Sequence, residues 1–173
     1  MSATGRVVLV TGAARGIGRC IAQAFAGKGH VAVVTDLDAA GARSTAAALG
    51  GAAHAYGMDV RDAAQVADVV ARVVHEHGAI DVLVNNAGRM TQGGFAATSH
   101  ADFGAMLDVN VVGIFNCVQA ISPAMMARRR GAIVNIASVS SVRGGGAVGN
   151  VWYGATKAAV VAMTSGLARE LGP

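Results

Sequence analysis

Residues 6–28 place a buried strand, a glycine turn and a helix in immediate succession. The run VVLV from Val7 has the length and β-branched composition of a strand covered on both faces. The turn TGAARGIG follows, and apolar residues then recur at the spacing of one helical face, at Ile17, Ile21, Ala24 and Phe25. Such a turn brings backbone N–H groups and the positive end of a helix dipole to one point, which favours binding of an anion.

Three glycines in this turn have separate expected roles. Gly12 takes the tight turn, Gly16 lets the backbone approach a ligand, and Gly18 lets the helix pack closely on the strand. Arg15 and Ile17 lie between them. The order T-G-x-x-x-G-x-G differs from the G-x-G-x-x-G fingerprint, and similar turns join strands to helices where no ligand binds. By itself the turn predicts an anion site and leaves the ligand open.

Strand and helix patterns alternate along the rest of the chain. Strands are expected at residues 30–36, 52–59, 80–85 and 131–138, and helices at residues 37–49 (with Asp38 as N-cap), 62–77, 99 or 100 to 127, and 152–171. Loops are expected at 86–94 and 139–150. This alternation predicts an α/β fold with a parallel sheet covered on both faces. Right-handed crossovers favour the doubly wound strand order 3-2-1-4-5.

Composition narrows the class of protein. With 53% apolar and 14% charged residues, the 173-residue chain is expected to form one globular domain over residues 1–173, without linkers or repeats. The run Arg128–Arg130 contributes to the net charge of +4, but it has no interleaved aromatic residues and predicts no nucleic-acid site.

Targeting signals and metal motifs are not expected. Cys20 and Cys117 are too few and too far apart for a metal site or a disulfide framework. No uncharged apolar stretch reaches the ~18 residues of a membrane span. The first six residues lack the shape of a signal peptide, so a cytoplasmic protein with reduced thiols is expected.

Polar residues at the ends of the predicted strands suggest a dinucleotide. Asp36 ends the second strand, where a carboxylate accepts hydrogen bonds from an adenosine ribose. The carboxylate would repel a 2′-phosphate and Leu37 supplies no cation, so NAD is favoured over NADP. Arg15 could bind a 2′-phosphate, and the preference for NAD over NADP is therefore not absolute.

Two further strand ends carry candidate residues. Asp59, followed by Val60, could bond an adenine amino group or cap the next helix, and both alternatives stay open. Asn86 can tie neighbouring segments together, while the small residues Ala87 and Gly88 leave room for a flat ligand. A turn without a ligand contact is the alternative.

Four polar residues could carry acid–base chemistry. Tyr153 and Lys157 are four residues apart and share one helical face, where an ammonium favours a phenolate over a phenol. Such a phenol can act as general acid or base on an alcohol or carbonyl oxygen. Ser138 ends the fifth predicted strand and can bond the same oxygen. Asn110, within an apolar helix, is either a satisfied core group or holds a water beside Lys157.

Together these residues resemble the short-chain dehydrogenase/reductase family in its NAD-preferring form, which has a Rossmann-type fold. The resemblance covers essentially the whole chain. It rests on the cofactor turn of residues 11–18, the NNAG motif of residues 85–88, and the tetrad of Asn110, Ser138, Tyr153 and Lys157. It implies hydride transfer between nicotinamide and a substrate carbon.

The resemblance also implies a role for each member of the tetrad. Tyr153 is the acid/base, Lys157 binds the nicotinamide ribose, Ser138 orients the substrate oxygen and Asn110 holds a proton-relay water. Dimers or tetramers are implied too, often through the helices of residues 102–127 and 152–171.

The sequence departs from the family after residue 171. The family continues with a strand, a substrate-covering lid and a last strand, and its Pro-Gly motif after the sixth strand is absent. Strand 5 would become an apolar sheet edge, and one face of strands 4 and 5 would lose a helix. The chain is a fragment, is completed by a partner, or is a degenerate relative. A shorter chain buries a smaller fraction of its surface, which favours the first alternative, a fragment. Such a fragment is expected to bind NAD weakly and to turn over poorly.

Two classes of function therefore follow. The first is an NAD(P)-dependent oxidoreductase that interconverts a secondary alcohol and a ketone. The second is a non-catalytic nucleotide-binding or assembly protein. Substrate walls are expected from residues 90–95 and 139–152, where the stretch after Arg143 lacks charge. A polyol or sugar is plausible, and a 3-oxoacyl thioester fits nearly as well.

Overall fold

A computed structural model describes residues 5–51, 53–146 and 149–172. The N-terminal residues 1–4, the expected strand residue Ala52, residues 147–148 of the expected glycine-rich loop, and Pro173 lie outside this description. The elements in chain order are β1 (Val7–Thr11), α1 (Gly16–Ala26), β2 (Val31–Asp36), α2 (Ala39–Leu49), β3 (Ala53–Gly57), α3 (Ala63–His77), β4 (Ile80–Asn85), η1 (Phe95–Ala97), α4 (His100–Leu107), η2 (Asp108–Val112), α5 (Gly113–Ala127), β5 (Ala132–Asn135), α6 (Ser140–Arg143) and α7 (Val151–Leu171).

The five strands form one parallel sheet in the order β3-β2-β1-β4-β5, which confirms the predicted topology. The first strand, β1, lies at the centre, with Leu9 opposite Val33 on one side and Leu83 on the other. All three side chains are fully buried, as expected for apolar strands covered on both faces. The carboxyl ends of the strands consequently meet at one edge of the sheet.

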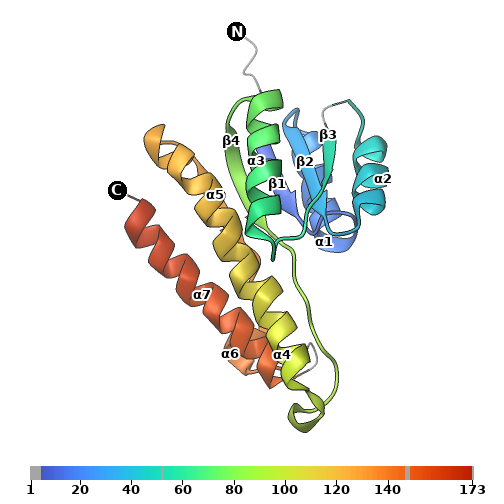
Figure 1. Cartoon of the computed structure of the whole chain (residues 1–173), viewed down its shortest axis with the longest axis vertical. Helices are drawn as coiled ribbons and strands as arrows, with labels where there is room; N and C mark the ends of the chain where they lie inside the picture. The colour runs from blue at the N-terminus through green and yellow to red at the C-terminus, as the bar shows by residue number, and fades with distance from the viewer. Residues whose placement is uncertain (1–4, 52, 147–148, 173) are drawn as a thin grey trace.

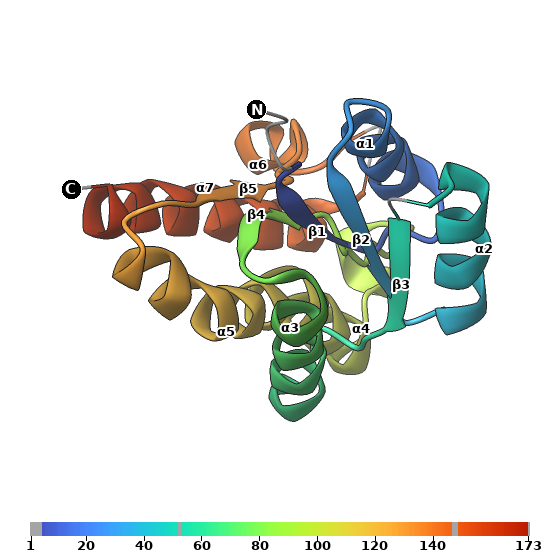
Figure 2. The same ribbon diagram turned by 90° about the horizontal axis from the view of Figure 1, so that it is seen from above.

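Helices cover both faces of this sheet (Figure 2), and the two apolar layers beneath them differ in the size of their side chains. On one face α1 and α2 pack through small residues such as Ala22, Ala42 and Ala46. On the other face α3, α5 and α7 pack through larger residues such as Val66, Ile121 and Val160. Small side chains allow the helices beside β1 and β2 to approach closely.

The far edge of the sheet is less covered. Val134 of β5 stands in register with Val84 of β4, on the face that α1 and α2 cover. Val84 is 2% exposed whereas Val134 is 45% exposed, so on this face β4 is covered and β5 is not. A groove of about 700 Å³ separates β5 from the C-terminal ends of α5 and α7, lined partly by Met125, Ile133 and Leu167.

Several predicted boundaries are wrong. The third strand ends at Gly57 rather than Asp59, the second begins at Val31 because His30 closes the turn after α1, and the fifth spans only Ala132–Asn135. The helix α6 occupies part of the expected loop, where the Ser138 hydroxyl accepts the Ser140 N–H and left-handed Gly144 ends the helix. Asp38 caps α2 as expected.

The long helix of residues 100–127 contains a π-helical turn, η2, between α4 and α5. The α4 and η2 part of this long helix lies alongside α7 in the lower half of Figure 1. The whole helix has a length and a mean hydropathy of 1.4 that would suffice to cross a membrane, but 44% of its apolar window is buried within the protein. Because its apolar face packs against α3, β4 and α7, a core position accounts for this composition.

Candidate active site

The glycine turn between β1 and α1 has the backbone geometry that the sequence suggests. Gly12 and Gly16 adopt φ values of +63° and +58°, which L side chains rarely adopt. A Cβ at Gly12 would lie 2.8 Å from the Cα of Ala87, and one at Gly18 would press against the Gly12 carbonyl. A Cβ at Gly16 would meet nothing within 4 Å. The turn is thus tightly packed inside and open outside, where a ligand can approach.

The N-terminus of α1 differs from those of the other long helices. Side chains of Asp38, Asp62, Ser99 and Asn150 cap α2, α3, α4 and α7. At the corresponding place before α1 stands Arg15, which makes no capping bond, and the first turn has no acidic residue. The first N–H groups of α1 therefore lack a side-chain acceptor and can bind an anion.

Asp36 lies beside this turn and supports it. One oxygen, Oδ2, accepts the Ala14 N–H at 2.9 Å, and Oδ1 accepts the Asp38 N–H at 3.0 Å. Each oxygen keeps lone-pair capacity for a ribose hydroxyl, because a carboxylate offers about four acceptor sites. The side chain of Leu37, the next residue in the chain, is 69% exposed and offers an apolar surface there.

The end of β3 excludes one of the two alternatives drawn from sequence for Asp59. Asp62, not Asp59, caps α3, so the capping alternative for Asp59 is wrong. The Asp59 carboxylate pairs with the Arg61 guanidinium, which holds the pKa of this carboxyl below its usual value. Val60 is buried, and its carbonyl accepts the side-chain N–H of Asn116 at 2.9 Å. Asn116, from α5, thus fixes the loop that carries Asp59 and Val60.

The end of β4 is tied to the glycine turn. Asn86 donates its side-chain N–H groups to the carbonyls of Thr11 and Gly12, both at 2.9 Å. The Thr11 hydroxyl accepts the backbone N–H groups of Asn86 at 3.1 Å and Ala87 at 3.0 Å. These bonds hold the turn against the end of β4. The Asn86 amide therefore ties the two segments together, as the sequence suggests.

Asn110 lies in the π-helical turn and is fully buried. Its Oδ1 accepts the Arg89 N–H at 2.8 Å, and its Nδ2 donates to the Arg89 carbonyl and the Thr156 hydroxyl, both at 2.9 Å. Thr156 in turn donates to the Tyr153 carbonyl. The side chain is therefore a satisfied core group that joins the segment after β4 to α7. Both hydrogens of the Asn110 amide are thereby used within the protein.

Lys157 and Tyr153 share one face of α7, as their spacing predicts. The Lys157 ammonium, 4% exposed, donates to the Ile136 carbonyl at 2.7 Å and lies 6.0 Å from the centre of the Tyr153 ring. Burial lowers the pKa of Lys157. A Cβ at Gly88 would lie 3.4 Å from Asn110 Oδ1 and 3.8 Å from Lys157 Nζ. The absence of a side chain at Gly88 keeps this corner open.

The Tyr153 ring rests on backbone. Gly149 has a φ of +69°, and a Cβ there would collide with the ring. Within the described part of the chain the Tyr153 hydroxyl makes no hydrogen bond. Ser138 lies after β5 rather than in it, and its hydroxyl accepts the Ser140 N–H at 3.1 Å. That hydroxyl still has a proton to donate to a substrate oxygen.

Comparison with known proteins shows which family the chain belongs to. The profile of the short chain dehydrogenase family matches residues 6–173. The chain belongs to that family. Galactitol 2-dehydrogenase of Agrobacterium fabrum is 41% identical over 172 residues, which cover 99% of this chain and 66% of that protein. The chain thus spans about two thirds of this relative's length.

Solved structures of short-chain dehydrogenases share the fold. A 3-ketoacyl-(acyl-carrier-protein) reductase from Brucella melitensis, complexed with NADH, is 34% identical with a TM-score of 0.92, covering 98% of this chain and 71% of that one. A gluconate 5-dehydrogenase from Burkholderia cenocepacia, in complex with NADP and tartrate, is 37% identical with a TM-score of 0.87, covering 96% and 66%.

Some residues of this short-chain dehydrogenase site are not evident from its sequence. Thr11, Asn116, Thr156 and Asn150 all act through hydrogen bonds to backbone groups, and Thr156 also accepts a bond from the Asn110 amide. Asn150 had a local signal, because it directly precedes a helix. Asn116 and Thr156 had none, since their partners are distant in sequence. No group of three or more metal-ligating side chains occurs among residues 5–51, 53–146 and 149–172.

Proposed function

We propose that this chain forms the cofactor-binding and acid–base part of an NAD-dependent oxidoreductase that interconverts a secondary alcohol and a ketone. The observation that carries the proposal is the uncapped N-terminus of α1 beside the Asp36 carboxylate, at the same sheet edge as Tyr153 and Lys157. An anion site, a ribose acceptor and a phenol with a neighbouring ammonium are together what hydride transfer requires of the protein.

The cofactor would be held by residues of the glycine turn and the strand ends. The N–H groups after Arg15 would bind the pyrophosphate, with Gly12, Gly16, Ile17 and Gly18 shaping the turn. Asp36 would bind the adenosine ribose, next to Leu37. Further contacts are assigned to Asp59, Val60, Asn86, Ala87, Gly88, Tyr153 and Lys157. The nicotinamide, when bound, supplies or accepts the hydride.

The chain's own residues would move the proton. The Tyr153 hydroxyl would donate a proton to the carbonyl oxygen or, in the reverse direction, its phenolate would take one from the alcohol. The buried Lys157 ammonium stabilises that phenolate and would bind the nicotinamide ribose. Ser138 would orient the substrate oxygen, and the backbone of Asn110 would hold a relay water.

We favour NAD over NADP and a polyol or sugar over a 3-oxoacyl thioester. Asp36 opposes a 2′-phosphate, although the gluconate 5-dehydrogenase holds NADP. The sugar-alcohol and sugar-acid dehydrogenases among the relatives above support a polyol or sugar, and the 3-ketoacyl reductase keeps a 3-oxoacyl thioester as the second candidate. Exposed Val112 and Phe115 on the long helix and Val161 on α7 support a homodimer or homotetramer. Free Cys20 and Cys117 support a cytoplasmic location.

A nicotinamide absorbance assay tests the proposal. The 173-residue chain would be given NAD and a panel of galactitol, other polyols, gluconate, 3-hydroxyacyl thioesters and steroids. We expect slow oxidation of a polyol, because the chain spans about two thirds of its relative's length. The variant Tyr153→Phe should lose all turnover and keep its NAD affinity within about twofold, since only the proton donor is lost.

Each result decides a different part of the proposal. Full activity of Tyr153→Phe would contradict the mechanism. Turnover of this chain at ordinary dehydrogenase rates would contradict the expected slowness. NAD binding without turnover on any substrate would favour a non-catalytic nucleotide-binding protein.

A further inference from the structure

Asn150 caps the helix that carries Tyr153. It directly precedes α7, and its side-chain oxygen accepts the backbone N–H groups of Trp152 and Tyr153, both at 3.1 Å. Asn150 is 8% exposed. The Tyr153 ring packs against the backbone of Gly149, immediately before this cap. Both the amide and the ring of Tyr153 are thus fixed by the two residues that enter α7.

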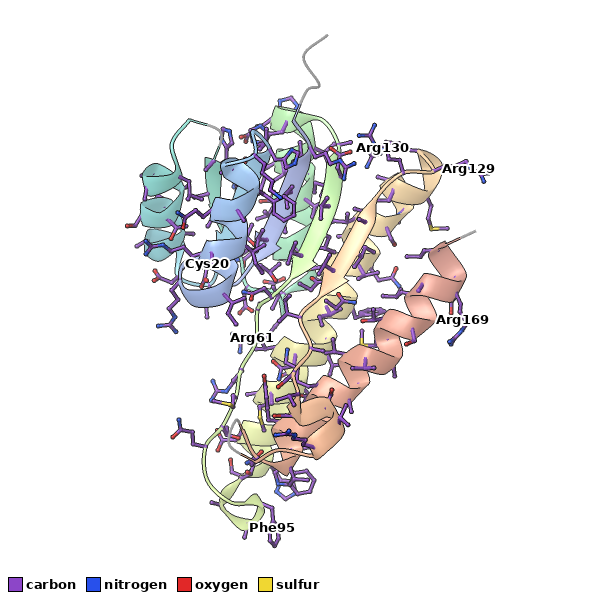
Figure 3. All side chains as sticks on the ribbon, turned by 180° about the vertical axis from the view of Figure 1, so that it is seen from behind. Cys20, Arg61, Phe95, Arg129, Arg130 and Arg169 are labelled. Carbon is purple, nitrogen blue, oxygen red and sulfur yellow. The ribbon has the colours of Figure 1, made fainter. Side chains whose placement is uncertain are left out.

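The other end of the Asn150 amide reaches a distant segment. Its Nδ2 donates to the Thr98 hydroxyl at 2.7 Å, 52 residues away in sequence. The adjacent Trp152 indole donates to the Phe95 carbonyl at 3.1 Å, and its ring lies 5.4 Å from that of Phe103. Phe95 itself is 70% exposed and marks the tip of the segment in Figure 3. Residues 95–98, next to an expected substrate wall, are therefore attached to the first turn of α7.

We propose that Asn150 is a positioning residue, which sets Tyr153 at a fixed place relative to residues 95–98. This inference rests on the proposed function for its consequence, since it makes the acid/base and the substrate wall move together. One planar amide makes both attachments, so a rotation that breaks one also strains the other. Proton transfer needs donor and acceptor within hydrogen-bond reach, and loss of this alignment lowers turnover.

Three variants separate the two attachments. Asn150→Ala loses both the cap of α7 and the hydrogen bond to Thr98. Thr98→Val keeps the shape of the residue 98 side chain and loses only that hydrogen bond. Asn150→Asp keeps an oxygen that caps α7 and can accept from the Thr98 hydroxyl, so it serves as the conservative rescue. Asp62→Ala is the matched control, because it removes the cap of a different helix, α3, where the Asp62 side chain accepts only the Ala64 and Gln65 N–H groups.

Two readouts are measured on the 173-residue chain with NAD and its best alcohol. In Asn150→Ala, kcat should fall about tenfold or more with NAD affinity nearly unchanged, and Asn150→Asp should restore it to within about threefold. Thr98→Val should lower kcat/KM by about threefold to tenfold. Trp152 is the chain's one tryptophan, so its emission reports the attachment directly. Asn150→Ala and Thr98→Val should shift the emission to longer wavelength, and Asp62→Ala should change neither readout.

The fluorescence and amide exchange keep the test independent of turnover. If the wild-type chain oxidises no alcohol, the proposed function fails. The positioning inference is then supported by a red shift with faster exchange of the Tyr153 amide in Asn150→Ala and Thr98→Val. Unchanged emission in both variants overturns the inference. So does a kcat in Asn150→Ala equal to that of the wild type.

Discussion

Asp36 has two tasks at once, because the carboxylate expected to bind a ribose also holds the glycine turn through Ala14. Asp36→Ala should therefore weaken binding of NAD without creating tight binding of NADP. An unsatisfied Ala14 N–H costs about 1–3 kcal/mol, which opposes any gain from removing the negative charge. Calorimetric titration with both dinucleotides measures the two affinities.

The control for that variant is Asp38→Ala. It removes the cap of α2, costs about 1 kcal/mol of stability and should leave the ratio of the NAD and NADP affinities unchanged. An Asp36→Ala protein that binds NADP more tightly than the wild type binds NAD would refute the supporting role of Asp36.

The buried Lys157 should give stability a distinctive pH dependence. Burial lowers its pKa in the folded protein below the unfolded value, so the folded state releases this proton first. Between the two pKa values the unfolded chain binds more protons, and stability rises with pH. The free energy of unfolding of the wild type relative to Lys157→Met should therefore increase as pH rises toward the ordinary lysine range. Urea titrations at neutral and alkaline pH measure it, and a falling difference would contradict the prediction.

At the scale of elements, the sequence predicts what local pattern determines. Each buried strand is a short apolar run, and the starts of α2, α3, α4 and α7 are each preceded by a capping residue, as α2 is by Asp38. These signals suffice for the strand order, since crossovers have one hand. The glycine turn is equally local, because positive φ at Gly12 and Gly16 is encoded by the residues themselves.

Elements that depend on contacts between residues distant in sequence are not predicted by local patterns. The π-helical turn η2 places Asn110 against the Arg89 backbone, a contact 21 residues away that no helical periodicity announces. The four-residue helix α6 depends on Ser138 turning back on its own chain. Strand β5 ends early, and the Ile136 carbonyl beyond it accepts the Lys157 ammonium. Asp59 pairs with Arg61 and does not cap α3, because that helix begins at Ala63, directly after Asp62.

On the scale of the whole molecule, the two faces of β5 are covered unequally. Val134→Lys places a charge on the exposed face of an edge strand and should reduce self-association, with a change in stability of about 0.5 kcal/mol or less. The neighbouring Ile133 points to the opposite face and packs against the core, so Ile133→Lys should cost about 2 kcal/mol or more. Sedimentation velocity and urea unfolding measure the two effects. Equal effects of both substitutions would disprove the asymmetry.

The uncapped start of α1 has a consequence for protein engineering. Position 15 has the extended backbone of an N-cap, with φ −157° and ψ 177°, but holds an arginine. An aspartate there would satisfy the first N–H groups of α1 and repel a phosphate from the same place. The protein leaves its first helix less stable than a single substitution could make it, and the proposed cofactor phosphates would take the place of the missing cap. Selecting variants for heat resistance alone would therefore tend to close this site.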